Sequence, residues 1–179
     1  MHLYSGKRNA ANKALIEEII LKKYNQYYRL AFSYTHNEAD ACDIVQNGAY
    51  KAIRSSHTLK EPQYAESWIY RIMLNECFQY IKRPKPLSYD VLQEENAIEA
   101  ESKEDHYADI DLQNALDILK DEDRIVIVLK YFEDKKLEEI ADILGENVNT
   151  IKSRLYRGIK KLRNILSDKT NGKNSERGN

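Results

Sequence analysis

The sequence contains few cysteines, prolines and glycines: 2, 3 and 6, respectively, among 179 residues. Cys42 and Cys77 are too few for a disulfide framework or for a zinc site, which takes about four Cys or His ligands. We expect both to be buried as small hydrophobic residues. Because 42% of the residues are hydrophobic, a collagen-like, low-complexity or wholly disordered chain is also excluded.

Long apolar runs are missing as well. The longest uncharged apolar run, Ile125–Leu129, has five residues, whereas a membrane-spanning helix needs about 20. Residues 1–20 carry charges throughout and contain no continuous apolar core, so no signal peptide is expected. These two absences predict a cytoplasmic protein.

The sequence also lacks catalytic and metal-binding motifs. The four histidines, at positions 2, 36, 57 and 106, lie far apart along the chain. There is no Gly-rich phosphate loop, nucleophile elbow or metal-ligand spacing. We therefore expect no enzymatic activity, no catalytic residue, no metal, no cofactor and no small-molecule substrate.

Charge is unevenly distributed, although the net charge is only −1. Residues 1–83 carry 12 basic and 8 acidic residues, residues 84–123 carry 3 and 13, and residues 124–179 carry 13 and 8. Two basic ends can bind a polyanion at two places while the whole chain stays near neutral. The acidic middle is either a solvated linker or a segment with an electrostatic role of its own.

Apolar residues at helical spacing predict helices in the first part of the chain. The first stretch covers 12–35, where three closely spaced tyrosines suggest a bend or a second helix. Asn37 is predicted to cap a helix over 38–55, with Asp40 at the capping-box distance.

A further helix is predicted over 64–83, after a loop that contains Pro62. One side of this helix is apolar and includes Trp68. Polar side chains recur at i, i+4 on another side and form a slowly rotating strip. The strip consists of Arg71, Asn75, Gln79 and Arg83.

Pro84 and Pro86 end that helix, and the acidic stretch 84–108 reads as a linker. The β-branched run Ile125–Val128 would suit a buried strand. A helix is favoured instead, because the apolar residues at 125, 128, 129 and 132 have helical spacing and no partner strand is evident. The expected fold class is therefore all-α. The helices expected after the linker cover 109–119, 122–132, 137–144 and 148–166.

The last two of these helices form the most informative pattern. Gly145 can take the positive φ of a tight turn, and Asn147 can cap the helix that follows. From Val148 to Leu166 there are six basic residues and no acidic one. A helix-turn-helix with small polar side chains near the start of its second helix suits the DNA major groove. The polar face consists of Asn149, Thr150, Ser153, Arg154, Tyr156, Arg157, Lys160 and Lys161.

Three segments resemble parts of bacterial σ70-family factors. Residues 39–46 resemble the polymerase-binding helix, and residues 67–75 with 80–83 resemble the −10 reading helix. Residues 137–141 with 149–157 resemble the −35 reading motif. The length and layout resemble the small extracytoplasmic-function (ECF) group, which retains only the domains σ2 and σ4. The likeness covers about residues 10–166. Residues 131–134 and 103–107 further suggest the σV-like subgroup.

The resemblance implies a σ2-like domain over 10–83, a linker over 84–108, a σ4-like domain over 109–168 and a polar tail over 169–179. It implies a dissociable sigma subunit that melts the −10 element and reads the −35 element of promoters. The alternative is a stand-alone helix-turn-helix regulator with an N-terminal sensing or dimerising domain.

The resemblance also implies roles for individual residues. Contacts to the β′ clamp helices of polymerase would come from Asp43, Gln46, Asn47 and Lys51. Contacts to the −10 element would come from Arg71, Asn75, Gln79, Lys82 and Arg83, with the loop 56–64 and Asn75 holding a flipped base. Contacts to the −35 element would come from Asn149, Thr150, Lys152, Ser153, Arg154, Tyr156, Arg157 and Lys160. The family usually has an acidic residue at 47 and a bulky residue near 48–50. The sequence Asn47-Gly48-Ala49 departs from this pattern, and Tyr50 is the candidate for the bulky residue.

Further expectations concern the partners that the resemblance implies, Trp68 and the acidic linker. The partners are core RNA polymerase, through its β′ clamp helices and β flap, promoter DNA, and a membrane-anchored anti-sigma factor that would hold the chain at the inner membrane face. Trp68 is either a stacking platform for a base or a core residue. The acidic linker is expected to discourage the basic domains from binding DNA without polymerase.

Overall fold

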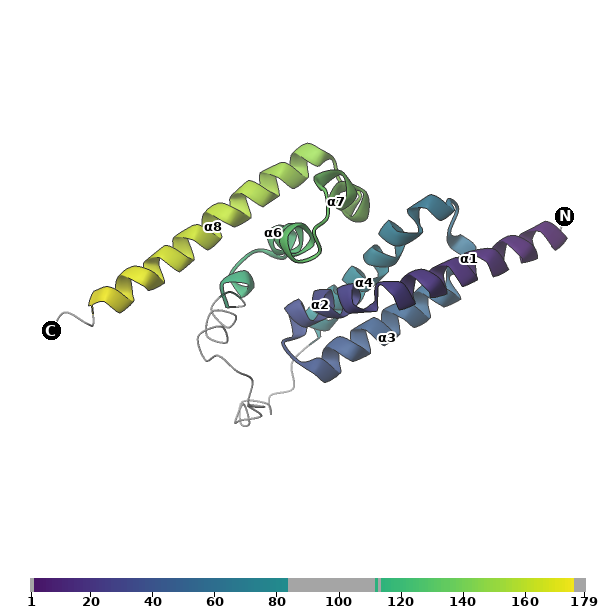
Figure 1. Ribbon diagram of the computed structural model, residues 1–179, viewed down its shortest axis with the longest axis horizontal. Coiled ribbons are helices and arrows are strands. Elements are labelled where there is room, and N and C mark those ends of the chain that lie inside the picture. The colour runs from purple at the N-terminus through teal and green to yellow at the C-terminus, as the bar shows by residue number, and fades with distance from the viewer. Residues whose placement is uncertain (1, 84–111, 113, 176–179) are drawn as a thin grey trace. The chain divides into compact units, whose positions relative to one another are not determined.

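The computed structural model describes residues 2–83, 112 and 114–175, with side chains for 8–83, 112 and 114–167. These residues are helical or in short connections, with no strand among them, which confirms the all-α prediction. The predicted linker 84–108 and tail 169–179 lie largely outside this part. The helices, shown in Figure 1, are α1 His2–Lys22, α2 Tyr24–Thr35, α3 Glu38–Arg54, α4 Ala65–Lys82, α6 Asp121–Ile127, α7 Leu137–Leu144 and α8 Val148–Ser175.

The described residues divide into two compact units. The first contains residues 2–82 together with 128–152, and the second contains residues 83–127 and 153–175 as far as they are described. Helix α8 begins in the first unit and continues into the second. Each unit is therefore built from segments that are far apart in the sequence.

The suggested second helix within 12–35 is present. Helix α1 ends at Lys22, and α2 begins at Tyr24. Asn37 caps α3 as predicted, because its side chain accepts a hydrogen bond from the backbone N–H of Asp40 at 3.0 Å. The Asp40 carboxylate instead accepts a hydrogen bond from the Tyr80 hydroxyl at 2.8 Å, which ties α3 to the end of α4.

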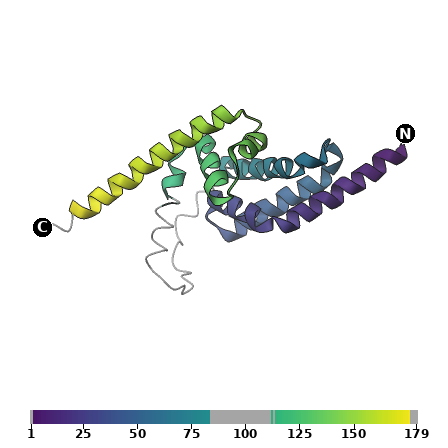
Figure 2. The same ribbon diagram turned by 45° about the horizontal axis from the view of Figure 1, so that its top comes forward.

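Helices α2, α3 and α4 pack together around the core of the first unit, and α1 lies along α3 in both ribbon views (Figures 1 and 2). The core contains the fully buried side chains of Tyr27, Leu30, Ile69 and Tyr70. Cys77 is buried as expected, and Cys42 is half-buried.

Gly48 of α3 lies against Met73 of α4. A Cβ atom at position 48 would overlap the Sδ atom of Met73, which is itself buried. A larger side chain at 48 would therefore require Met73 to move. This accounts for one departure of Asn47-Gly48-Ala49 from the family pattern.

The helix predicted over 122–132 is partly wrong. Helix α6 ends at Ile127, and Val128–Phe132 forms a π-helical turn in which the N–H of Glu133 donates to the carbonyl of Val128 at 3.2 Å. The segment is nevertheless helical and not a strand, as its 3, 4, 7 spacing predicted. Ile125–Leu129 is fully buried, which explains why it reads as a continuous apolar run.

The predicted turn between α7 and α8 is confirmed. Gly145 has φ 67° and ends α7 in the left-handed region, where glycine carries no steric penalty. The Asn147 side chain accepts from the N–H of Thr150 at 2.8 Å and caps α8. Helix α8 runs to Ser175, beyond the predicted end at 166.

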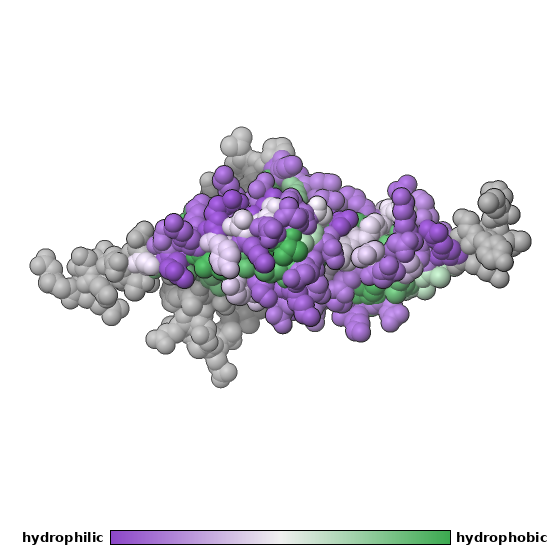
Figure 3. Space-filling model, turned by 90° about the horizontal axis from the view of Figure 1, so that it is seen from above, coloured by the Kyte–Doolittle hydropathy of each residue, from purple (hydrophilic) through white to green (hydrophobic). Residues whose placement is uncertain are grey.

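Within the described helices, none is long and apolar enough to cross a bilayer. The face drawn in Figure 3 is mostly hydrophilic, with small hydrophobic areas between the charged side chains.

Candidate nucleic-acid interface

The outer face of α3 carries the residues predicted to bind polymerase. Asp43, Gln46 and Asn47 are exposed, and Tyr50 beside them is 62% exposed. Lys51 is half-exposed, and its Nζ atom lies 2.6 Å from Oε1 of Glu76, a buried residue of α4. The first three side chains are thus presented to a partner, whereas Lys51 also joins two helices.

All five predicted −10 residues are exposed on or just after α4: Arg71, Asn75, Gln79, Lys82 and Arg83. Arg71 has a different environment. Its Nε atom donates to the carbonyl of Ile143 at 2.9 Å, and its Nη2 atom donates to the carbonyl of Asp142. These carbonyls are at the C-terminal end of α7, where the helix dipole favours a cation.

The loop between α3 and α4 contains two short 3₁₀ turns, Ser56–Thr58 and Pro62–Tyr64. Ser56 and Leu59 are each 3% exposed, whereas the residues from 60 to 64 are exposed. The loop therefore has buried anchors and an exposed polar tip. Trp68, just after it, is half-buried, so both readings of this residue stay open.

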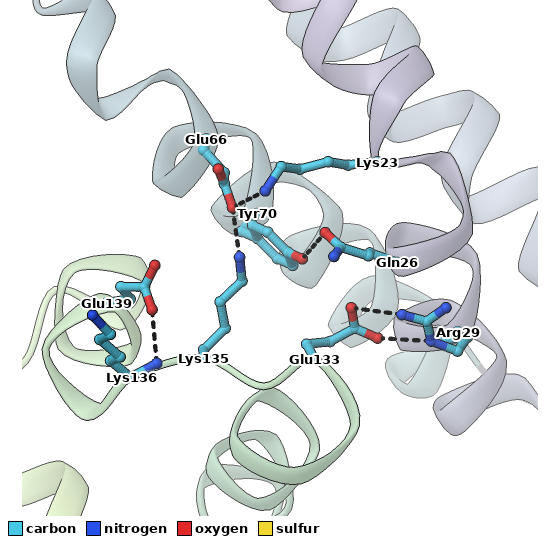
Figure 4. Close-up of polar contacts among 9 residues, drawn as sticks. All are labelled: Lys23, Gln26, Arg29, Glu66, Tyr70, Glu133, Lys135, Lys136 and Glu139. Atoms are coloured by element: carbon cyan, nitrogen blue, oxygen red, sulfur yellow. Dashed lines mark hydrogen bonds and ion pairs between the residues drawn. The ribbon is translucent and has the colours of Figure 1, made fainter.

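A polar cluster that the sequence did not predict joins α2 and α4 to residues 133–135 within the first unit (Figure 4). Glu66 Oε1 lies 2.6 Å from Lys23 Nζ and 2.5 Å from Lys135 Nζ. Burial alone would raise the pKa of Glu66, but the hydrogen bonds and charges of the two lysines outweigh it and lower that pKa below its ordinary value.

The second acid of this cluster, Glu133, is fully buried and binds the guanidinium of Arg29 through two hydrogen bonds of 3.2 Å. Here burial outweighs the attraction of Arg29, so the pKa of Glu133 is raised. Lys135 Nζ also lies 5.0 Å from the ring centroid of Tyr70, whose hydroxyl donates to Gln26 at 3.2 Å. Burial is the main reason that the pKa of Tyr70 is raised. No local pattern marks these residues, because their partners are distant in the sequence.

Helix α8 carries all eight predicted −35 residues. Lys152, Tyr156, Arg157, Lys160, Asn149 and Ser153 are exposed, and Thr150 and Arg154 are half-buried. The apolar side of the helix is covered near its start, where Ile151 is fully buried, while Leu166 is 38% exposed. The predicted two-sided helix is thus observed in its first turns.

Arg157 binds a buried acid that the sequence analysis missed. Its Nε atom donates to Oδ2 of Asp123 at 2.7 Å, and its Nη2 atom donates to Oδ1 of the same carboxylate. Asp123 is 2% exposed, whereas the Arg157 side chain is 55% exposed. The hydrogen bonds and charge of Asp123 raise the pKa of Arg157. One edge of the guanidinium is held by α6, and its remaining N–H groups are left to solvent.

Among the residues whose side chains are described, no group of three or more His, Cys, Asp or Glu side chains is placed to hold a metal ion. The exposed side chains that α3, α4 and α8 present are mainly amides, hydroxyls and cations. Such groups can bind phosphates and base edges.

Two family models match the chain in order along the sequence. The model described as Sigma-70 region 2 matches residues 19–85, and the model described as Sigma-70, region 4 matches residues 109–162. Together they cover the helices α2 to α4 and the helix-turn-helix.

Curated relatives agree with these matches. The chain is 42% identical to the RNA polymerase sigma factor SigV of Bacillus subtilis over 159 residues, which is 88% of this chain and 94% of that protein. It is 32% identical to the ECF RNA polymerase sigma factor SigW of the same organism over 158 residues, covering 80% of this chain and 84% of that protein.

Two solved structures share the fold. CnrH in complex with the cytosolic domain of CnrY matches with a TM-score of 0.69 and 20% identity over 93% of this chain and 96% of that chain. The sigma factor RpoE of Bartonella quintana, in complex with the anti-sigma factor NepR, matches with a TM-score of 0.61 and 21% identity over 84% and 96%.

Proposed function

The chain belongs to the ECF group of the sigma-70 family, the promoter-recognition factors of bacterial RNA polymerase, and from this premise we propose how its helices divide that task. The expected likeness to the σV-like subgroup is confirmed, and the family is one of DNA-binding initiation factors. The observation that carries the proposal is the ordered match to regions 2 and 4. We place the σ2-like domain at 10–83 and the σ4-like domain at 109–168.

The outer face of α3 is proposed to bind the β′ clamp helices of core polymerase, with a further contact to the β flap elsewhere on the chain. Exposed Asp43, Gln46 and Asn47 support this role, and Tyr50 supplies the large side chain beside them. Lys51 would add a charge to this face while it stays paired with Glu76.

The strip on α4 is proposed to bind the melted −10 element, with Asn75 and the loop 56–64 holding an unstacked base. Gln79, Lys82 and Arg83 are exposed and suited to the strand backbone. Binding an extruded base offsets the cost of unstacking it, about a few kcal/mol, so no nucleotide hydrolysis is needed. Arg71 would have to leave the carbonyls of α7 before it binds DNA.

The exposed face of α8 is proposed to read the −35 element. Asn149, Thr150 and Ser153 near the helix start suit base edges, and Lys152, Arg154, Tyr156, Arg157 and Lys160 suit bases or phosphates. The capped N-terminus of α8 also favours a phosphate. Arg157 would act with one edge of its guanidinium already bound to Asp123.

An anti-sigma factor is the proposed regulator of this chain in the cytoplasm, and its anchor in the membrane would hold the chain there. Support comes from the two solved structures, each of which is a complex of a similar fold with its own partner. The test is co-purification from the native host: a membrane protein whose removal raises target transcription is the expected partner.

Run-off transcription with purified core polymerase tests the central proposal. Adding the chain should produce transcripts from a subset of a promoter library, and the selected promoters should share two elements at a fixed spacing. Asn75→Ala should weaken selection at the −10 element, and Lys160→Ala should weaken binding at the −35 element about equally for all sequences. Tight binding of the chain alone to duplex DNA, with no association with core, would instead support the stand-alone regulator.

A further inference from the structure

Helix α1 contacts the loop between α3 and α4 through a buried amide. Asn12 is 3% exposed, and its Nδ2 atom donates to the backbone carbonyls of Ser56 at 3.2 Å and Leu59 at 2.9 Å. One side chain therefore binds the loop at two points that are three residues apart. Both acceptors belong to residues that are themselves buried.

A second contact comes from one turn earlier in α1. The Ser56 hydroxyl donates to Oδ1 of Asn9 at 2.9 Å. The Leu59 side chain lies in the core at 3% exposure. Together these contacts fix the first half of the loop, while its tip at residues 60–64 is left exposed.

The two hydrogen bonds of Asn12 are directed at the backbone of the loop, and that of Asn9 at the Ser56 hydroxyl, so the contacts lie before the exposed tip. Loss of the Asn12 amide would remove a donor from the Leu59 carbonyl and one of two donors from the Ser56 carbonyl, which also accepts from the Leu59 N–H at 3.2 Å. A loop that holds an unstacked base binds more tightly when its backbone is already ordered, because less conformational entropy is then lost on binding.

We propose that Asn12, assisted by Asn9, is a positioning residue for base recognition in the −10 element, because it holds the loop 56–64 in its base-binding conformation. This inference rests on the role proposed above for that loop. Asn12 does not touch DNA; it acts through Ser56 and Leu59. Sequence specificity therefore depends on helix α1, which carries none of the predicted DNA contacts.

The experiment is run-off transcription on a library randomised over the −10 and −35 elements, using the full chain with core polymerase. Asn12→Leu keeps the branching of the side chain at Cγ, is somewhat larger, and has no donor. It should reduce discrimination among bases at a −10 position about tenfold, the factor for about 1.4 kcal/mol. Discrimination at the −35 element should stay as in the wild type, because the hydrogen bonds of Asn12 go to the loop between α3 and α4 and not to α8.

Two variants separate positioning from general stability. Asn9→Ala removes an exposed side chain and should change the −10 preference in the same direction by a smaller factor, even if Asn12→Leu fails to fold. Tyr70→Phe removes a buried hydroxyl that donates to Gln26, away from the loop, and serves as the matched control. If both asparagine variants change base preference no more than Tyr70→Phe does, the inference is overturned.

The failure of this inference is distinguishable from failure of the loop's proposed role. Gln63→Ala and Tyr64→Ala alter the exposed tip directly. If these tip variants leave the −10 preference unchanged, the loop does not recognise a base and both ideas fall. If the tip variants change it and the asparagine variants do not, only the role of Asn12 is wrong.

Discussion

The α3–α4 pair and the α6–α8 pair are built alike, but the ion pair between their helices has one hydrogen bond in the first and two in the second. In each, a glycine permits close helix packing: Gly48 against Met73, and Gly158 against Ile127. In each, an exposed cation binds a buried acid on the other helix. Lys51 reaches Glu76 with one contact, whereas Arg157 binds Asp123 through two hydrogen bonds.

The difference concerns how firmly a functional cation is held. A lysine ammonium is a rotatable point charge, whereas a guanidinium bound through two N–H groups has a fixed plane. Lys51 can therefore redirect its remaining N–H groups while it stays paired with Glu76. Arg157 presents its outer N–H groups in one orientation, which suits recognition of a base edge or a phosphate.

The largest effect is expected from adding a methyl group at Gly48, and Gly158 provides the comparison. Gly48→Ala should lower the free energy of unfolding by about 1–3 kcal/mol, because its Cβ overlaps buried Met73. Gly158→Ala should be within about 1 kcal/mol of the wild type, because its Cβ meets Ile127 atoms at 3.1–3.2 Å and alanine favours the helix. Urea denaturation followed by circular dichroism measures both.

A rescue variant sharpens the contrast at Gly48. Met73→Ala should cost less stability in the Gly48→Ala background than in the wild type, because the added methyl group no longer overlaps the methionine, so the two changes should not be additive. Strict additivity would show that the methyl group is accommodated elsewhere and that Met73 does not set the helix spacing.

The next largest effect is expected at Asp123. Asp123→Asn removes the charge that holds Arg157, and transcription that depends on the −35 element should fall about tenfold, as for loss of one arginine contact. Arg157→Lys should be similarly impaired, because lysine lacks the two-pronged donor geometry. Transcription from wild-type and −35-mutated promoters provides the measurement. Full activity of Arg157→Lys would show that only charge is needed.

A smaller effect is expected at the lysine pair. Lys51→Met leaves the buried Glu76 carboxylate unpaired and should destabilise the chain by about 1–2 kcal/mol, more than Glu76→Gln does. The double variant Lys51→Met, Glu76→Met replaces the pair with apolar side chains and should recover stability. If Lys51 binds polymerase, the double variant should still bind core more weakly. Wild-type affinity for core would assign Lys51 a structural role only.

The smallest effect is expected on the pH dependence of stability, to which Glu66 contributes through its lowered pKa. Because the folded pKa of Glu66 is lowered, its contribution is fully present above the ordinary glutamate value of 4.5 and is lost as the pH falls through the folded pKa. The contribution should stay below about 1 kcal/mol, since the side chain is partly exposed. The stability difference between wild type and Glu66→Gln should therefore shrink below that pH. A difference that stays constant in acid would contradict the ion pairs with Lys23 and Lys135.

Local pattern determined the helical class, the break between α1 and α2, the Gly145 turn and the exposed faces of α3 and α8. Helical periodicity, helix caps and a glycine with positive φ depend only on residues close together in the sequence, so they can be predicted from the sequence alone. The π-helical turn at Val128–Phe132 escaped this reading, because a uniform apolar run gives no sign of a shift in hydrogen bonding.

Tertiary structure alone decided which charged and amide groups meet. Asp123 and Arg157 are 34 residues apart, Lys51 and Glu76 are 25 apart, and Asn12 and Ser56 are 44 apart. The periodicity of apolar residues predicts which side of a helix is buried, but it does not predict which residues of other helices pack against that side. The sequence therefore indicated the surfaces proposed to meet promoter and polymerase, and packing assigned the buried partners that hold some of their side chains in place.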